Sequence, residues 1–193
     1  MIAQRSLPFA LAVVPASLAW RAGLVLGASL LIALAAQVAI PLPFSPVPVT
    51  GQTYAVLVVG AALGSRLGAL SVALYVAEGV LGLPVFAPGG APGIARVLGP
   101  TGGYLVGFVG AAFIVGWLCE RGFDRDVPRC ALAMLAGELV VYAAGIPWLA
   151  LFVPADRVLV AGLLPFVPGD LVKLVLAALT PPAAWRVYAP SRP

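Results

Sequence analysis

Apolar runs, each long enough to cross a lipid bilayer, follow one another along this chain of 193 residues. Proline, glycine or charged residues separate them, and a helix needs ~17–25 apolar residues to span a bilayer. Only 9% of the residues are charged, against about 25% in a typical soluble domain. Because so few charges could not cover a surface in water, the sequence predicts an integral membrane protein.

The runs are continuous rather than alternating, which favours helices over the strands of a closed barrel, the other fold that satisfies its backbone inside lipid. We predict an all-α protein with six transmembrane helices in a single membrane domain, 1–193. It comprises an N-terminal interfacial segment (1–20), a core (21–186) and a cytoplasmic tail (187–193). A signal peptide over 7–19 is the alternative for the first segment, although Pro15 interrupts it. The expected helices cover residues 21–40, 49–65, 66–83, 101–119, 131–153 and 169–186.

Basic residues gather on one side of this six-helix arrangement. Arg96 and Arg157 fall on the other side, and Lys173 lies within the last helix. By the positive-inside rule the basic side is cytoplasmic, with both termini, in a bacterial cell (inner) membrane. The arginines form no basic stripe, so the net charge of +4 does not indicate nucleic-acid binding. The cytoplasmic set is Arg5, Arg21, Arg66, Arg121, Arg125, Arg129, Arg186 and Arg192.

The three outer loops are rich in proline and glycine yet apolar. They cover residues 41–48, 84–93 and 165–170. Proline fixes the backbone, so we expect ordered, packed loops. Simple helix termination would explain one such loop, whereas three on one face favour a lid over a ligand pocket.

Several kinds of chemistry lack their usual residues. The chain has no histidine, which removes the commonest general base and metal ligand. Cys119 and Cys130 alone make a poor zinc site, and no phosphate-binding Gly-x-x-x-x-Gly-Lys-Ser/Thr loop occurs. We therefore predict no enzyme, no cofactor and no metal. An intramembrane enzyme using Asp170 and Glu138 is the weakest alternative, because no nucleophile–base set accompanies the two carboxyl groups.

Ionisable residues inside membrane spans are functional candidates. Asp170 and Lys173 lie three residues apart, hence on one helix face. Asp170 follows Pro168 and Gly169, so it is expected at a helix N-terminus, where the helix dipole favours an anion. A ligand site and a purely structural ion pair are the two interpretations.

Other polar residues leave alternatives open. Arg96 in an outer loop either binds an anionic ligand group or is a solvated charge. Gln52, beside Thr50, either contacts a ligand or caps a helix. Glu138 is expected to bond a neighbouring helix rather than a ligand, and Glu78 to reach water.

Small residues recur at four-residue spacing in the first expected helix. Gly23 and Gly27 form one pair, and Ser29 and Ala33 form another. Such spacing lets a second helix approach closely. These four residues are the candidate partner-docking face.

Four motifs, in this order along the chain, resemble the BioY family. They are Ile40–Gln52, Gly82–Ala87, Gly99–Phe108 and Pro165–Lys173. The resemblance covers about residues 21–186. It implies six helices and high-affinity capture of biotin as the substrate-binding S component of an energy-coupling factor (ECF) transporter. The implied partners are a transmembrane T component and ABC-type ATPase subunits.

Biotin suits this set of residues. Its ureido ring offers N–H donors and a carbonyl, its ring and valerate chain need an apolar trough, and its carboxylate needs a cation. The Asp170–Lys173 pair is too compact to hold both ends, so Arg96 is expected at the other, and the sequence leaves open which end is which. A self-sufficient biotin transporter without ATPase partners is the alternative, although no inverted repeat supports it. The candidate substrate-binding residues are Asp170, Lys173, Arg96, Gln52, Phe44, Phe86 and Tyr142.

Overall fold

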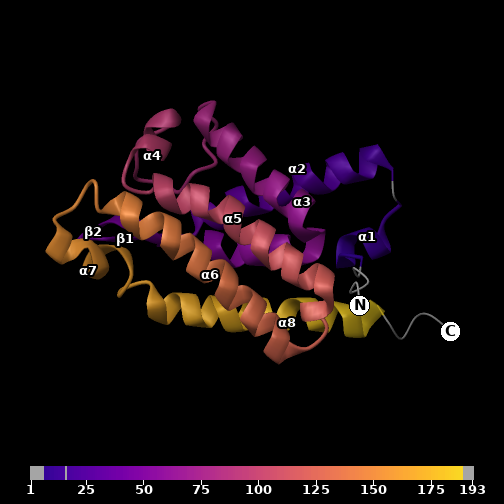
Figure 1. The fold of residues 1–193 in the computed structure, drawn as a ribbon. Helices are drawn as coiled ribbons and strands as arrows, with labels where there is room; N and C mark the ends of the chain where they lie inside the picture. Colours follow the sequence, from indigo (N-terminus) through magenta and orange to yellow (C-terminus); the bar gives the residue numbers. More distant parts are fainter. Residues whose placement is uncertain (1–6, 16, 189–193) are drawn as a thin grey trace.

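The computed structural model describes residues 7–15 and 17–188. Arg5 and Arg192, used in the charge argument, lie outside these ranges. Figure 1 shows long helices packed side by side, with the hairpin and the short helices α4 (Ile94–Leu98) and α7 (Val158–Gly162) towards the end away from the termini. This confirms the predicted helical membrane protein. The helices long and apolar enough to span a membrane are α2 (Leu18–Gln37), α3 (Gln52–Val80), α5 with its π-helical end (Gly102–Phe123), α6 (Val127–Leu149) and α8 (Val167–Tyr188).

Helix α3 reverses direction at Gly64. This residue has a non-helical φ of 79°, which glycine adopts at no steric cost. The side chain of Gln52 donates to the Tyr75 hydroxyl at 2.6 Å, although a straight helix would separate residues so spaced by about 35 Å. The two halves of α3 are therefore antiparallel, close to the boundary expected between Ser65 and Arg66.

The expected loop over 41–48 is instead a β-hairpin. Strands β1 (Ala39–Leu42) and β2 (Ser45–Thr50) pair antiparallel, with an irregularity between Ile40 and Leu42 where Pro41 lies. Helix α2 therefore ends before the expected Ile40, and residues 49 and 50 belong to a strand rather than to a helix. Because proline is tolerated at edge strands and bulges, a proline-rich segment can still form this hairpin.

Short elements complete the end of the molecule that carries the hairpin. Helix α4 (Ile94–Leu98) lies in the segment between α3 and α5. A 3₁₀ turn (Ala155–Arg157) and helix α7 (Val158–Gly162) link α6 to α8. The Ser45 hydroxyl donates to the Ala161 carbonyl at 2.6 Å, which ties the hairpin to α7.

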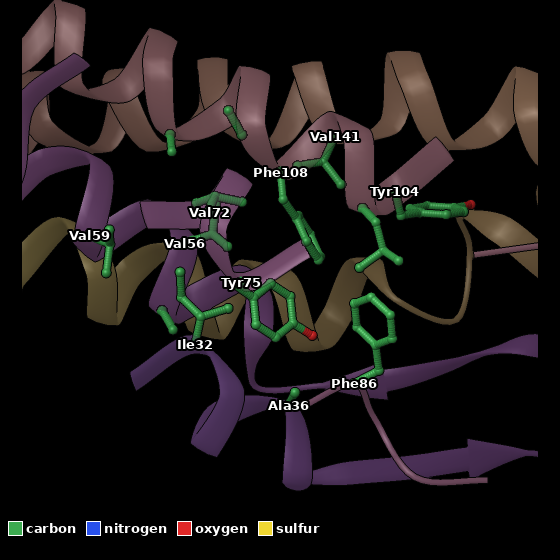
Figure 2. Packing of buried hydrophobic residues seen from close by; sticks show 14 of the residues in the cluster. Ile32, Ala36, Val56, Val59, Val72, Tyr75, Phe86, Tyr104, Phe108 and Val141 are labelled. Carbon is green, nitrogen blue, oxygen red and sulfur yellow. The ribbon is translucent and has the colours of Figure 1, made fainter. Parts of the chain in front are cut away.

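Helices α3 and α5 form the centre of the packing, and α2, α6 and α8 surround them. Ile32 of α2, Val56 and Val72 of α3 and Phe108 of α5 are buried together (Figure 2). Glycine allows the closest approach, because an ideal Cβ on Gly60 would lie 2.7 Å from the Ala112 carbonyl oxygen. A bundle of this kind buries much of α3 and α5 and leaves the outer helices partly exposed.

Polar contacts close the end opposite the hairpin. Glu120 accepts from both the backbone and the hydroxyl of Ser65 at 2.8 Å, next to the turn at Gly64. Asp124 is buried against Trp185, and burial raises the pKa of its carboxyl. The short N-terminal helix α1 (Phe9–Val13) packs here too, with the Phe9 ring edge-on to Trp185. Among the described residues of the expected interfacial segment (1–20), α1 is the helical part that precedes the start of α2 at Leu18.

The outward faces of the outer helices are strongly apolar. On α2, Leu26, Leu30 and Leu34 are each more than half exposed, as are Leu171 and Val175 on α8. Soluble monomers rarely expose continuous apolar surface of this kind. Lipid is the solvent that these faces require.

Candidate functional site

A pocket of about 630 Å³ of empty space, partly open to solvent, lies at the hairpin end. Six of the seven candidate substrate-binding residues line it, drawn from α3, α4, α6, α8 and the segment after α3. The lining is Val47, Pro48, Thr50, Gln52, Thr53, Phe86, Ala87, Arg96, Thr101, Tyr104, Leu105, Phe108, Glu138, Val141, Tyr142, Phe166, Asp170 and Lys173.

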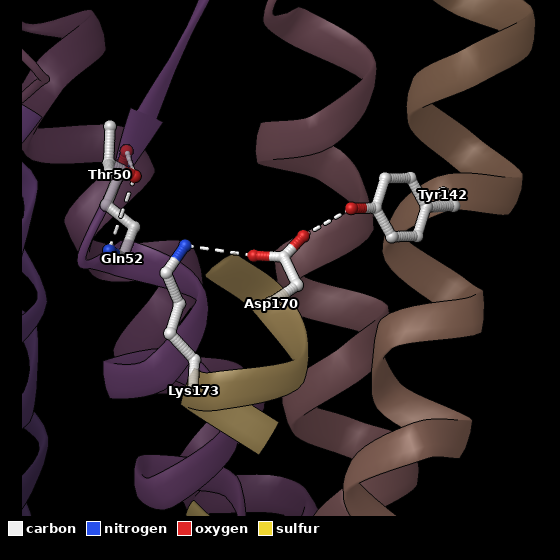
Figure 3. A network of polar contacts seen from close by, with 5 residues as sticks. All are labelled: Thr50, Gln52, Tyr142, Asp170 and Lys173. Atoms are coloured by element: carbon white, nitrogen blue, oxygen red, sulfur yellow. Dashed lines mark hydrogen bonds and ion pairs between the residues drawn. The ribbon is translucent and has the colours of Figure 1, made fainter. Parts of the chain in front are cut away.

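Asp170 is the hub of one polar network in the pocket. Lys173 donates to its Oδ1 at 2.9 Å, and the Tyr142 hydroxyl donates to its Oδ2 (Figure 3). Asp170 lies in the first turn of α8, where the helix dipole stabilises an anion. The ion pair therefore forms in the empty pocket, and the lysine keeps further N–H donors for a ligand.

Gln52 belongs to a second network on the opposite side of the view in Figure 3. Its side-chain oxygen accepts from the Thr50 hydroxyl at 3.0 Å, and its amide nitrogen donates to the Tyr75 hydroxyl. Both ends of the amide are thus engaged, although the nitrogen retains one hydrogen for a ligand. The structure adds a role that neither earlier interpretation included: Gln52 links the two halves of α3.

Arg96 lies on α4 and points back into the protein rather than into water. It is 9% exposed and donates from Nη2 to the Ala87 carbonyl. Its guanidinium lies against Gly90, where a Cβ would collide with it. Burial lowers the pKa of Arg96 from its ordinary value, and its Nε has no hydrogen-bond partner among the described residues. The interpretation of Arg96 as a solvated loop charge is therefore wrong. Arg96 is instead a buried cation that lines the pocket.

Aromatic side chains form the apolar walls. The Phe86 ring meets Tyr75 edge-on at 5.6 Å and covers Gly79, which has no side chain to obstruct it. The hydroxyl of Tyr104 donates to the Gly162 carbonyl at 2.8 Å, which fixes its ring beside the pocket. Phe44, the remaining candidate, is 60% exposed at the hairpin turn and does not line the pocket.

Glu138 also lines the pocket, although the sequence predicted that it would bond a neighbouring helix rather than a ligand. It is 4% exposed, and neither carboxylate oxygen has a hydrogen-bond partner in the described part of the chain. The expected bond to a neighbouring helix is therefore absent there. The spacing of Glu138 could have indicated its position in the pocket, because it lies one helical turn before Tyr142 and on the same face of the helix. Glu78, expected to reach water, instead accepts from the Ser29 hydroxyl at 3.1 Å.

The four small residues of α2 point in two directions. Gly23 and Gly27 are exposed, with no atom of the protein within 4 Å of an added Cβ. Ser29 and Ala33 are buried inside the chain. A single docking face of all four is therefore wrong, because residues 27 and 29 lie on different sides of a helix. Of these four residues, Gly23 and Gly27 are the two that offer a surface to another helix.

Together these features define a class of protein. An apolar cavity with a few buried charges, set among membrane-spanning helices, suits the reversible binding of an amphipathic small molecule. Two cations, Arg96 and Lys173, come from separate elements and can hold anionic groups.

Comparison with known proteins gives the family. The chain matches the BioY family over residues 4–190. It is 42% identical over 149 residues to a probable biotin transporter BioY of Pyrococcus horikoshii, covering 77% of this chain and 86% of the relative. It is 43% identical over 166 residues to a biotin transporter BioY of Rhodobacter capsulatus, covering 79% and 85%. The chain belongs to the BioY family.

A solved structure supports the same conclusion. The fold matches the crystal structure of the S-component for biotin from an ECF-type ABC transporter with a TM-score of 0.76 and 27% identity, covering 88% of this chain and 90% of that one. The resemblance inferred from four motifs is thus confirmed. Because the family and these relatives are transporters, the prediction that the chain is no enzyme is confirmed as well.

Proposed function

We propose that this chain captures biotin from the outer side of the membrane with high affinity, as the S component of an ECF transporter. The observation that carries the proposal is the pocket, in which an apolar trough contains buried cations from separate elements. Biotin has an apolar ring and chain between two polar ends. The Asp170–Lys173 pair serves one end and Arg96 the other, with Gln52, Phe86 and Tyr142 beside them.

The proposed topology has six spans, counting the antiparallel halves of α3 separately. The pocket, the hairpin, α4 and α7 then lie outside, and the Gly64 turn, Arg125 and both termini lie in the cytoplasm. The positive-inside rule supports this orientation. The membrane is proposed to be the inner membrane of a bacterial cell.

Reporter fusions test this orientation. We expect cytoplasmic signals from fusions after Arg125 and at the C-terminus, and external signals from fusions near Gly89 and Asp156. The reason is that an even number of spans returns the chain to its starting side. One reproducible inversion among the four sites would contradict six spans.

The proposed partners are a T component and ABC-type ATPase subunits, and the docking face on α2 is Gly23 with Gly27. Their open surface lets a partner helix approach the backbone closely. We expect Gly23→Leu and Gly27→Leu to reduce biotin uptake by at least about tenfold, the effect of a loss of ~1.4 kcal/mol at a helix contact. Biotin binding by the purified variants should stay unchanged, because neither glycine is among the residues that line the pocket.

The matched control is Ala143→Leu, which adds similar bulk to an exposed position of α6 and should leave uptake intact. Uptake by vesicles is measured with and without the coupling subunits. Equal uptake in both preparations would show a self-sufficient transporter and contradict the proposed coupling. Unchanged uptake in both glycine variants would place the docking face elsewhere.

A further inference from the structure

We propose that the pocket takes up a proton on Glu138 when it binds its anionic ligand. The inference rests on the proposed function, since it treats biotin as the ligand. It assigns a role to the one buried carboxyl group of the pocket that the binding scheme above does not use. Three observations support it: the location of Glu138, its lack of partners, and the balance of charge around it.

The contrast with Asp170 shows that Glu138 is the available carboxyl group. Each oxygen of Asp170 already accepts a hydrogen bond, one from Lys173 and one from Tyr142. Glu138 lines the same cavity, yet both its oxygens are buried and have no partner in the part of the chain that the structure describes. A buried carboxylate without partners is costly. A ligand, a proton or both must therefore satisfy Glu138.

Charge balance favours the proton. The charged side chains among the described lining residues are Arg96, Lys173, Asp170 and Glu138. With both acids ionised, the empty pocket is neutral overall. Entry of a ligand carboxylate then leaves one excess negative charge in a low-dielectric space, where like charges repel strongly. A proton on Glu138 removes that excess and supplies an O–H donor for a ligand acceptor.

The neighbours of Glu138 define what else could titrate. Asp170 and Lys173 face it from α8, Tyr142 from its own helix, Tyr104 from α5, and Arg96 lies across the pocket on α4. The lining residues from α3 and β2 are Gln52, Thr53, Thr50, Val47 and Pro48, which do not titrate. All these groups stay in place when Glu138 is replaced by glutamine. A comparison of the two proteins therefore isolates the carboxyl group.

The test is the pH dependence of biotin affinity between pH 6 and pH 9, measured calorimetrically on the purified full chain. The biotin carboxyl stays ionised throughout, since free carboxylic acids of this type titrate near pH ~4.3. Wild-type affinity should fall as pH rises, by up to about tenfold per pH unit for one linked proton. The Glu138→Gln variant should bind biotin with a markedly flatter profile. A flat wild-type profile, or an equal slope in the variant, would overturn the proposal.

A second measurement needs no variant. Binding enthalpies in two buffers of different ionisation enthalpy give the number of protons taken up. We expect uptake of a sizeable fraction of one proton with biotin near pH 8, and much less with its uncharged amide. No uptake, or equal uptake with both ligands, would contradict the inference. Biotin binding without proton uptake would leave the proposed function standing, whereas absence of biotin binding at every pH would remove both.

Discussion

Replacing Asp170 by asparagine should weaken biotin binding by roughly tenfold to a hundredfold or more. Asp170 is 9% exposed and holds both Lys173 and Tyr142 in place. Asparagine keeps the shape but removes the charge, and it leaves the lysine unpaired inside the pocket. A hydrogen bond to a charged group is worth ~1.5–3 kcal/mol, which sets the size of the effect. The measurement is titration calorimetry of the purified variant with biotin.

A double-mutant cycle separates a binding role from a structural one. Lys173→Gln should also weaken binding, and the double variant should lose less than the sum of the two, because each substitution compensates the charge that the other leaves. Tyr142→Phe, which removes one donor to Asp170 without a change of charge, should weaken binding less than Asp170→Asn does. Each variant must run as monodisperse protein in detergent. Wild-type affinity in folded Asp170→Asn would show that the pair is only structural.

Replacing Gly60 by leucine should prevent folding of the bundle. Gly60 lies where the first half of α3 crosses α5 and meets the second half of α3. An ideal Cβ there would lie 2.9 Å from the Ala112 Cα, and a Cβ on Gly68 would lie 2.9 Å from the Gly60 Cα. Backbone atoms cannot move aside as a flexible side chain can. Overpacking typically costs 1–3 kcal/mol and occasionally more, so we expect a loss of about 3 kcal/mol or more.

The measurement is the yield of monodisperse protein in detergent and its midpoint of thermal unfolding. Gly82→Ala is unsuitable as a control because its φ of 95° is itself unfavourable for other residues. Gly27→Leu is suitable, since nothing lies within 4 Å of an added Cβ, and it should fold as the wild type does. If Gly60→Leu unfolded at the wild-type midpoint, the close crossing of α3 and α5 would be wrong.

The sequence predicted the helical spans well because each apolar run is bounded by proline, glycine or charge. The helix break expected between Ser65 and Arg66 occurs at Gly64, where positive φ is possible. The hairpin over 39–50 was missed, because proline usually argues against strands and its irregular pairing depends on contacts such as that of Ser45 with Ala161. Local patterns do not encode such distant contacts.

The site was predictable where chemistry is unusual for a membrane. Asp170 and Lys173 stand out as charges within an apolar span, and Arg96 as a basic residue on the side that the sequence predicts to be external. The direction of a side chain is harder to infer. Ser29 and Gly27 are close in sequence but lie on opposite faces of α2. Only the folded bundle shows that the Glu138 carboxylate has no hydrogen-bond partner among the described residues.

Direct binding of biotin to the purified wild-type chain, without any partner subunit, tests the central claim most directly. Titration calorimetry in detergent should show one saturable site with a dissociation constant in the nanomolar range, which corresponds to a binding free energy of about −12 kcal/mol. Thiamine and riboflavin, which lack the ureido ring and the valerate carboxylate, should not bind measurably. Absence of biotin binding by monodisperse protein, or equal binding of the unrelated vitamins, would contradict the account.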